Sequence, residues 1–289
     1  AGTYRPAIKY RIKASIKNGK ITGYHLKEAA INGNMYGSIP NFFPAGCIPN
    51  YKVSTGNYKS NISTGAWRAP YTNFLAFAEQ SFFSELADEL GKDHPTLLIE
   101  LLQNVKGTKD KRIEYSGERM EKTIKLAVEK SNWGYTPKGT YQGFSAYYSH
   151  NTHVAEVADV EIENGKPVVK KVTVAVDCGI VVNPLGAKNQ IEGGVIDGIG
   201  HAMYGDFSFK EGVPQAENFD NYRLIRMQET PKVFAYFVES DLSPTGLGEP
   251  ALPPAGGALA NAIKAATSNQ LYQQPFINHL ETVGNKFLG

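Results

Sequence analysis

One carboxylate lies in a stretch of glycine and proline at residues 244–263, which read PTGLGEPALPPAGGALANAI. Gly246 and Gly248 let the backbone turn sharply or approach another group, and Pro250 stiffens the chain directly after Glu249. A carboxylate held in a constrained turn is suited to act as a positioned general base. The alternative is a favourable contact between Glu249 and the N-terminus of the helix that follows, worth about 0.3–1 kcal/mol.

A glutamine followed by glycines is a second candidate for a functional site. Residues 183–207, NPLGAKNQIEGGVIDGIGHAMYGDF, have the pattern of a helix, although a glycine inside a helix costs up to about 1 kcal/mol relative to alanine. Gly193 and Gly194 leave room for a ligand or for a neighbouring backbone, and Gln190 offers amide donors and an acceptor. Cofactor contact and close packing of the helix on a sheet both account for this pattern.

The histidines and cysteines do not predict a metal site. His150 and His153 are three residues apart, so on a strand they would point to opposite faces. Cys47 and Cys178 have neither a CxxC nor a Cys/His ligand spacing, which excludes zinc and iron–sulfur sites built by this chain.

Alternating apolar residues around Asn-Gly pairs predict two β-hairpins, with turns at Asn18-Gly19 and Asn164-Gly165, and a third is expected around Glu211-Gly212. Apolar periodicity predicts helices within residues 72–93, 95–104, 117–134 and 253–270, besides the glycine-containing one. For the first helix, Thr72 or Asn73 is the expected cap. Its expected inward face consists of Phe74, Phe77, Ala78, Phe82 and Leu86.

The mixture of helices and antiparallel hairpins indicates an α+β fold rather than a parallel doubly wound sheet. The glycine- and aromatic-rich residues 131–150 are interpreted as a loop that leads into the second hairpin. The repeated hairpin pattern predicts duplicated hairpin-plus-helix lobes, residues 1–130 and 131–289.

Composition narrows the classes of partner. The 289 residues contain 30 Lys+Arg against 28 Asp+Glu, a net charge of +2 that does not predict nucleic-acid binding. No apolar run reaches the roughly 18–20 residues that a membrane-spanning helix needs. The chain starts directly in a strand pattern without a signal peptide or initiating Met, so we expect it to be a piece of a longer protein.

Three stretches together resemble one family. Residues 64–87 (TGAWRAPYTNFLAFAEQSFFSELA), 176–205 (VDCGIVVNPLGAKNQIEGGVIDGIGHAMYG) and 246–263 (GLGEPALPPAGGALANAI) are similar to the C-terminal part of molybdenum hydroxylase large subunits, in the xanthine oxidase and aldehyde oxidase superfamily. The resemblance is greatest to the isoquinoline 1-oxidoreductase type of aldehyde dehydrogenase subunit, and it covers nearly the whole chain. It implies a molybdopterin-binding domain.

The resemblance also implies roles for individual residues. Glu249 matches the glutamate of the family's GxGEP motif, which serves as the base when an aldehyde or N-heterocycle is oxidised with water-derived oxygen. The residues expected at the cofactor are Gln190, Gly193, Gly194, Gly248 and Arg68. The residues expected at the substrate are Trp67, Tyr71 and Leu247, although buried aromatic residues more often belong to a core.

The implied cofactor is a molybdopterin with molybdenum, in its cytosine dinucleotide form. The family's MGQG-like stretch does not occur in the chain, so the resemblance implies a partner in the N-terminal remainder of the same subunit. It also implies a small subunit with iron–sulfur clusters, and it favours a periplasmic over a cytoplasmic location. The competing hypothesis is a non-catalytic ligand-binding module, in which the 16 Tyr and 14 Phe line a groove.

Overall fold

The computed structural model describes residues 3–33 and 42–280, which form two main sheets and five α-helices. The first sheet has the order β1-β2-β3. Its strands are β1 (Ile8–Lys17), β2 (Lys20–Ile31) and β3 (Asn50–Tyr58). The β1–β2 hairpin turns at Asn18 and Gly19, whose φ angles of 52° and 68° both suit a tight hairpin turn. The first predicted hairpin is therefore confirmed, and β3 adds to it in parallel.

The second sheet has the order β4-β5-β6-β9. Its strands are β4 (Thr140–Ser149), β5 (Thr152–Glu163), β6 (Lys166–Asp177) and β9 (Lys232–Phe237). The β5–β6 hairpin turns at Asn164 and Gly165 as predicted, and β9 pairs in parallel with β6. The two-residue strands β7 (Phe209–Lys210) and β8 (Val213–Pro214) form the predicted third hairpin.

The prediction of a loop over residues 131–150 is wrong, because residues 140–149 form β4 and pair with β5 along their whole length. The glycines of this segment concealed its strand pattern, because glycine is depleted in strands. Gly143 has a packing role: a Cβ atom there would lie 2.0 Å from the backbone nitrogen of Ala262. The strand thus needs glycine where a helix backbone crosses it.

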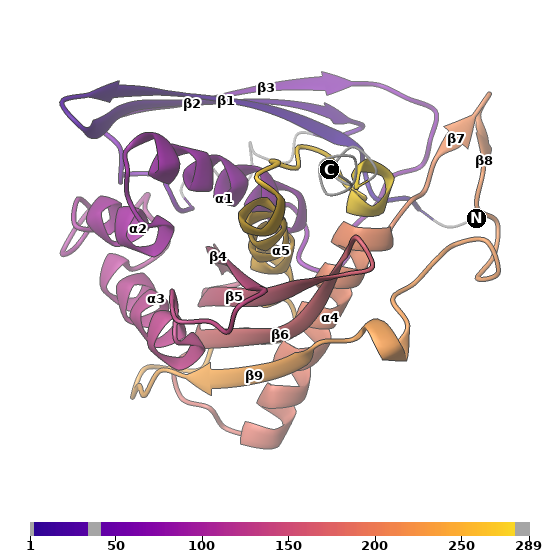
Figure 1. Cartoon of the computed structure of the whole chain (residues 1–289). Helices are drawn as coiled ribbons and strands as arrows, with labels where there is room; N and C mark the ends of the chain where they lie inside the picture. The colour runs from indigo at the N-terminus through magenta and orange to yellow at the C-terminus, as the bar shows by residue number, and fades with distance from the viewer. Residues whose placement is uncertain (1–2, 34–41, 281–289) are drawn as a thin grey trace.

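The helices are α1 (Thr72–Glu89), α2 (His94–Leu102), α3 (Gly117–Ser131), α4 (Pro184–Tyr204) and α5 (Leu252–Thr267). Two short 3₁₀ helices, η2 (Met227–Glu229) and η3 (Phe276–His279), complete the described elements. Figure 1 shows β1–β3 lying across α1, and α5 lying between α1 and the second sheet. Helix α3 covers the opposite face of that sheet, and α4 packs beside α5.

This arrangement is α+β, as the sequence indicates. Nearly every residue of α5 is buried, because the helix contacts α1, α4 and the second sheet at once. The segment before α5 carries Glu249, so the most enclosed helix of the second half anchors the Gly/Pro turn. The two lobes, residues 1–130 and 131–289, stay a prediction, and parts of both lie outside the described residues.

Helix α1 differs from its predicted amphipathic face. Leu75, Ala76, Phe83 and Leu86 are buried, whereas Phe74, Phe77, Ala78 and Phe82 are only half-buried. The helix also buries Glu79, whose carboxylate accepts hydrogen bonds from the hydroxyls of Tyr24 and Tyr147 at 2.8 Å and 2.7 Å. The predicted face differs from the observed one because a buried carboxyl group is tolerated when two hydroxyls form hydrogen bonds with it. Burial also raises the pKa of Glu79 to about 8, which favours its neutral form.

Helix α1 also lacks the expected side-chain cap, because its N-cap is Tyr71. Thr72 and Asn73 instead bond back to the preceding loop. The Thr72 hydroxyl donates to the carbonyl oxygen of Ala69 at 3.2 Å, and the Asn73 amide donates to that of Arg68 at 2.8 Å. The start of α1 therefore shapes the segment that contains Arg68. In the part of the chain that the structure describes, no helix has the length and apolar character needed to cross a membrane.

Candidate active site

The carboxylate of Glu249 is held at both oxygens by groups distant in sequence. Its Oε1 accepts a hydrogen bond from the backbone N–H of Ala69 at 3.0 Å. Its Oε2 lies 2.6 Å from Nε2 of His150. The side chains of Glu249 and His150 are each 36% exposed, so the pair stays open to a reactant. The described partners of the carboxylate are thus the Ala69 loop and His150, not the first amides of α5.

Arg68 ties the Glu249 loop to α4. Its Nε donates to the carbonyl oxygen of Gly248 at 2.8 Å, and a terminal nitrogen donates to that of Gln190 at 3.2 Å. The same guanidinium lies 3.5 Å from the Asp197 carboxylate. Desolvation raises the pKa of Asp197, and the nearby Arg68 charge opposes this rise. One guanidinium therefore connects the three segments that carry Arg68, Gln190 and Glu249.

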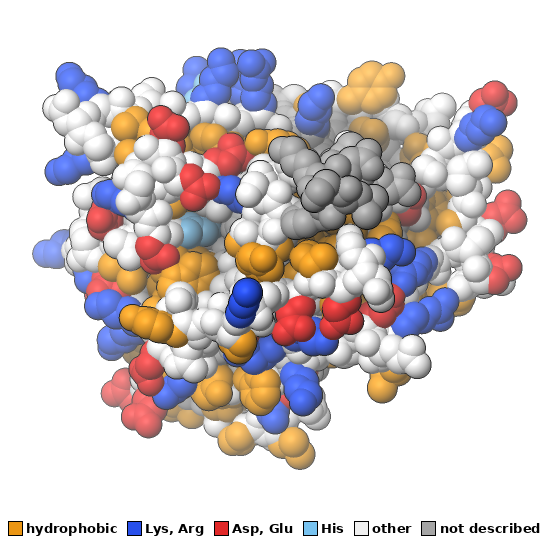
Figure 2. Space-filling model, in the orientation of Figure 1, with side chains coloured by type: hydrophobic (Ala, Val, Ile, Leu, Met, Phe, Trp, Pro, Cys, Tyr) orange, Lys and Arg blue, Asp and Glu red, His pale blue; other side chains and the backbone are white. Residues whose placement is uncertain are grey.

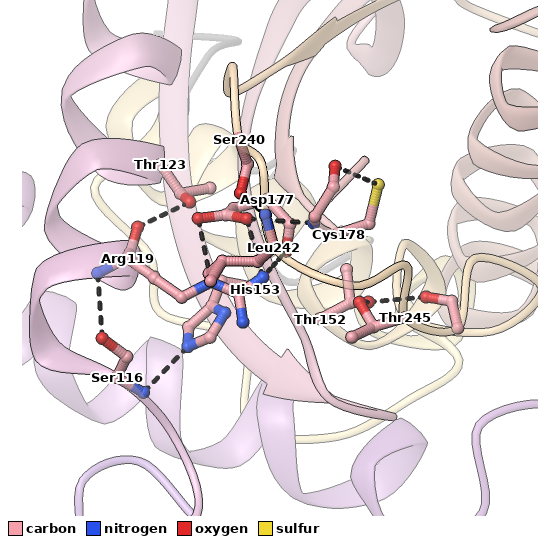
Figure 3. A network of polar contacts seen from close by, with 12 residues as sticks. Ser116, Arg119, Thr123, Thr152, His153, Asp177, Cys178, Ser240, Leu242 and Thr245 are labelled. Atoms are coloured by element: carbon pink, nitrogen blue, oxygen red, sulfur yellow. Dashed lines mark hydrogen bonds and ion pairs between the residues drawn. The ribbon is translucent and has the colours of Figure 1, made fainter. Parts of the chain in front are cut away.

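A second network fixes the segment before Glu249, and Figure 3 shows how it reaches the second sheet. The hydroxyl of Thr152, at the start of β5, donates to the carbonyl oxygen of Gly246 at 2.6 Å and lies 2.7 Å from the Thr245 hydroxyl. The Thr245 N–H donates to the carbonyl oxygen of Cys178 at 2.9 Å. The loop is consequently held from the β4–β5 turn and from the end of β6.

The strand ends in this network are themselves held by an ion pair. Arg119 of α3 contacts the Asp177 carboxylate at 2.7 Å and 3.0 Å. Asp177 is nearly fully buried, and Arg119 holds its pKa below the usual range although desolvation acts in the opposite direction. His153 lies beside them, and burial lowers the pKa of its imidazole to about 3. This arrangement stabilises the scaffold behind the loop.

Several non-glycine residues at the site have left-handed backbone conformations. The φ angles are 57° for Ala69, 68° for Tyr71, 52° for His150 and 61° for Asn151. Such conformations are unfavourable for residues with a Cβ and persist where surrounding contacts enforce them. Here they direct the Ala69 N–H and the His150 ring towards one carboxylate.

The residues predicted at the cofactor lie together. Gln190 is exposed, and a Cβ on Gly248 would have the Gln190 side-chain oxygen as its nearest neighbour, at 3.9 Å. A Cβ on Gly193 would meet only Arg68, also at 3.9 Å. Gly194 differs, since a Cβ there would lie 3.1 Å from that of Ala251. Gly248 and Gly193 therefore border open space, whereas Gly194 serves close packing between α4 and α5.

The residues predicted at the substrate lie in different surroundings, and their substrate role stays a prediction. Tyr71 is exposed at the start of α1, and Leu247 is half-buried against the core of the second sheet. The ring of Trp67 packs 4.5 Å from that of His201 and lines a cavity of about 1290 Å³ beside α1 and α4. Burial, followed by the Arg5 charge, lowers the pKa of His201 to about 3, so this imidazole is neutral. The half-buried face of α1, including Phe74 and Phe77, lines the same cavity.

Sequence reasoning missed His150 as a partner of Glu249. It placed His150 on a strand with His153, but His150 lies in the turn between β4 and β5. The motif SHN, with an asparagine that favours a left-handed turn, is the one local signal of this position. The contact itself joins residues almost one hundred positions apart, which no local pattern reveals. Across residues 3–33 and 42–280, no group of three His, Cys, Asp or Glu side chains is arranged to hold a metal ion.

Comparisons with known proteins identify the family to which this fold and the Glu249 loop belong. Residues 98–231 match the molybdopterin cofactor-binding domain family. Quinoline 2-oxidoreductase from Pseudomonas putida 86 superposes over 98% of this chain and 63% of its own, with a TM-score of 0.80 and 11% identity. Aldehyde oxidoreductase from Desulfovibrio gigas superposes over 96% of this chain and 49% of its own, with a TM-score of 0.75 and 15% identity.

Sequence matches to curated proteins point to the same family. The chain is 30% identical over 221 residues to the membrane-bound aldehyde dehydrogenase [pyrroloquinoline-quinone] of Gluconacetobacter polyoxogenes, covering 73% of this chain and 29% of the relative. It is 28% identical over 207 residues to isoquinoline 1-oxidoreductase subunit beta of Brevundimonas diminuta. This match covers 70% of this chain and 25% of the relative. The chain belongs to the molybdenum hydroxylase superfamily, a family of oxidoreductases, and spans less than a third of the length of these relatives.

Proposed function

We propose that this chain supplies the catalytic base and part of the cofactor site of a molybdopterin-dependent oxidoreductase acting on an aldehyde or an N-heterocycle. The single observation that carries the proposal is the Glu249 carboxylate, which is oriented by the Ala69 N–H and by His150 yet remains partly exposed. We infer the substrate class from the names of relatives, which are an aldehyde dehydrogenase, an isoquinoline oxidoreductase and a nicotinate dehydrogenase.

The residues around Glu249 fit a molybdopterin. The cofactor offers amide-like ring edges and anionic phosphate, which need hydrogen-bonding groups and close backbone approach. The exposed Gln190 amide provides donors and an acceptor, while Gly193 and Gly248 border open space. Arg68 would hold Gly248 and Gln190 in register, since it bonds both of their carbonyl oxygens. When bound, the group would supply a molybdenum centre that accepts two electrons from the substrate.

In this proposal Glu249 takes up a proton at Oε2 during turnover. The Ala69 N–H stabilises the charged carboxylate through Oε1, and proton transfer takes place at Oε2, on the side of His150. His150 Nε2, 2.6 Å away, can share that proton. The other ring nitrogen lies 2.7 Å from the Ser149 hydroxyl, which in turn lies 2.9 Å from the hydroxyl of Thr72. This chain of polar groups would fix the orientation of the imidazole.

The proposal includes partners. The chain contains two cysteines, both free and buried, so iron–sulfur clusters that carry electrons away belong to a separate small subunit. The remainder of the same subunit would complete the cofactor site, and the cofactor would be the cytosine dinucleotide form. A periplasmic location is proposed from the family resemblance.

The test of this function uses the full-length subunit purified with its neighbours from a host that makes the cofactor. Molybdenum content is measured together with dye reduction on a panel of aldehydes and N-heterocycles. The proposal predicts stoichiometric molybdenum and reduction with members of one of these classes. A preparation without molybdenum contradicts it, as does a molybdenum-loaded preparation that oxidises neither class.

A further inference from the structure

The outer face of the first sheet concentrates positive charge. Side chains alternate between the two faces of a strand, and on β1 the outward positions are occupied by basic residues. The exposed basic side chains of this face are Lys9, Arg11, Lys13, Lys27 and Lys52, and we call this set the basic face. Figure 2 shows Lys and Arg side chains gathered along the top of the molecule, over β1–β3.

Strand register brings these charges into rows. Lys13 lies opposite His25 of β2, and His25 lies opposite Lys52 of β3. In the next row Arg11 lies opposite Lys27. Like charges directly opposite each other in a sheet are destabilising, so the pairing of Arg11 with Lys27 costs folding free energy.

No carboxylate of the same strands relieves this repulsion. The described strands of the sheet contain one acidic residue, Glu28, which is 3% exposed and belongs to the inward face. None of the five basic residues forms an ion pair within residues 3–33 and 42–280. Desolvation, and then the charges of Lys27, Lys52 and Lys13, lower the pKa of His25. The basic face therefore carries positive charge that no ion pair of the described residues balances, although the net charge of the chain is only +2.

The chemistry of the basic face selects among anionic partners. Four of its five cations are lysines, which are depleted in the centres of protein–protein interfaces, whereas arginine and aromatic residues are enriched there. Single-stranded nucleic acids require aromatic stacking platforms, but Tyr10, Tyr24 and Tyr51 belong to the inward core instead. A broad sheet face bearing lysines suits a surface of anionic lipid headgroups, to which each lysine contributes without specific geometry.

The centre of the basic face is hollowed. A depression of about 480 Å³ is lined by Arg11, Lys27, Lys52, His25 and Ser54 among others. His25 Nε2 lies 3.0 Å from the Ser54 hydroxyl, so polar groups accompany the cations there. A phosphate headgroup matches this combination of positive charge and hydroxyl groups.

We propose that the basic face docks the protein on the surface of an anionic lipid bilayer. Docking of this kind is peripheral and electrostatic, so it is reversible and weakens as salt rises. The catalytic proposal for Glu249 is independent of it.

The test measures binding of the full-length protein, assembled with its subunits, to sedimented vesicles. One set contains phosphatidylcholine alone, and the other contains phosphatidylcholine with one third phosphatidylglycerol. We expect binding to the anionic vesicles only, and its loss at high salt. Replacing Lys13→Gln, Lys27→Gln and Lys52→Gln together should lower the partition coefficient roughly 100-fold, because each lysine contributes about fivefold.

The matched control replaces three exposed lysines elsewhere, Lys109→Gln, Lys111→Gln and Lys122→Gln, which removes the same total charge. The proposal requires the control to bind nearly as the parent does, with both variants showing the parent's circular dichroism spectrum. Equal losses in the two variants, or equal binding to neutral vesicles, overturn it. If the parent ignores vesicles but binds heparin or an acidic protein through the same lysines, the partner is a different polyanion and the membrane proposal fails.

Discussion

Glu249 and His150 form a close pair, with Oε2 of the carboxylate 2.6 Å from Nε2 of the imidazole, although the two residues lie almost one hundred positions apart in the sequence. The pair exists because the β4–β5 turn and the Gly/Pro loop are tied together by Thr152 and Gly246. A carboxylate that would otherwise point freely from a loop is thereby given one orientation. Orientation of this kind is what a general base requires.

The first prediction concerns the histidine of this pair. His150→Ala should lower kcat about 10-fold with little change in KM, because it removes a hydrogen bond to a charged group from the base. His150→Gln keeps an amide donor and should retain more of the activity. The check is steady-state kinetics with molybdenum content measured in parallel. A loss of molybdenum in proportion to kcat would show instead that His150 maintains the site structure.

The second prediction concerns packing between α4 and α5. A Cβ on Gly198 would lie 2.8 Å from the Cβ of Ala255 and 2.8 Å from the Leu252 oxygen, so Gly198→Ala should destabilise the fold by about 1–3 kcal/mol. Gly193→Ala is the matched variant in the same helix, because its new Cβ would meet only Arg68 at 3.9 Å. It should be neutral or stabilising by up to about 1 kcal/mol. Urea denaturation measures the free energy of unfolding of both variants. Equal changes in that free energy would contradict the packing geometry.

The third prediction concerns pH and the buried Glu79. Burial raises the pKa of Glu79 to about 8, although hydrogen bonds from Tyr147 and Tyr24 oppose the rise. Between about pH 6.5 and pH 8 the folded chain therefore holds a proton at Glu79 that the unfolded chain has released. Stability should fall as pH rises through this window, by up to about 1.4 kcal/mol per pH unit.

Glu79→Gln should reduce that slope, whereas Glu89→Gln, an exposed residue of the same helix, should leave it unchanged. The slope should not vanish, because burial also raises the pKa of Glu156. Below about pH 6.5 the trend reverses, because burial lowers the pKa of His94, His153 and His201 to about 3. The three protons that these imidazoles take up only in the unfolded chain outnumber the two that Glu79 and Glu156 hold in the folded chain. Melting temperatures measured across the pH range provide the check, and identical profiles for parent and Glu79→Gln would refute the assignment.

Local signals were sufficient for much of the fold. Asn18-Gly19 and Asn164-Gly165 predicted their hairpins because few residue pairs adopt two left-handed conformations in succession. The sequence also indicated α4 despite its glycines, where Asn183 caps the helix through the Gly186 N–H. Strand β4 was missed because Gly143 reflects packing against α5, which is a tertiary constraint.

For the candidate site too, the sequence indicated the residues within motifs but not the contacts between distant segments. The motifs indicated Glu249, Gln190 and Arg68, and the structure brings these three segments together. They could not indicate His150 or Asp197, whose importance depends on contacts between distant segments. Trp67 was expected at the substrate from its position beside Arg68, yet its ring lies against His201 in the large cavity. The substrate role of Trp67 stays a prediction.

The most direct measurement compares substrate oxidation by Glu249→Gln and by Glu239→Gln, each in the full-length protein with molybdenum content determined. Glu239 is an exposed carboxylate ten residues before Glu249, so the control removes the same charge outside the site. We expect kcat to fall by a factor of about 10²–10⁴ in Glu249→Gln with molybdenum retained, and to be unchanged in Glu239→Gln. Full activity in a molybdenum-loaded Glu249→Gln protein would contradict the assignment of Glu249 as the base.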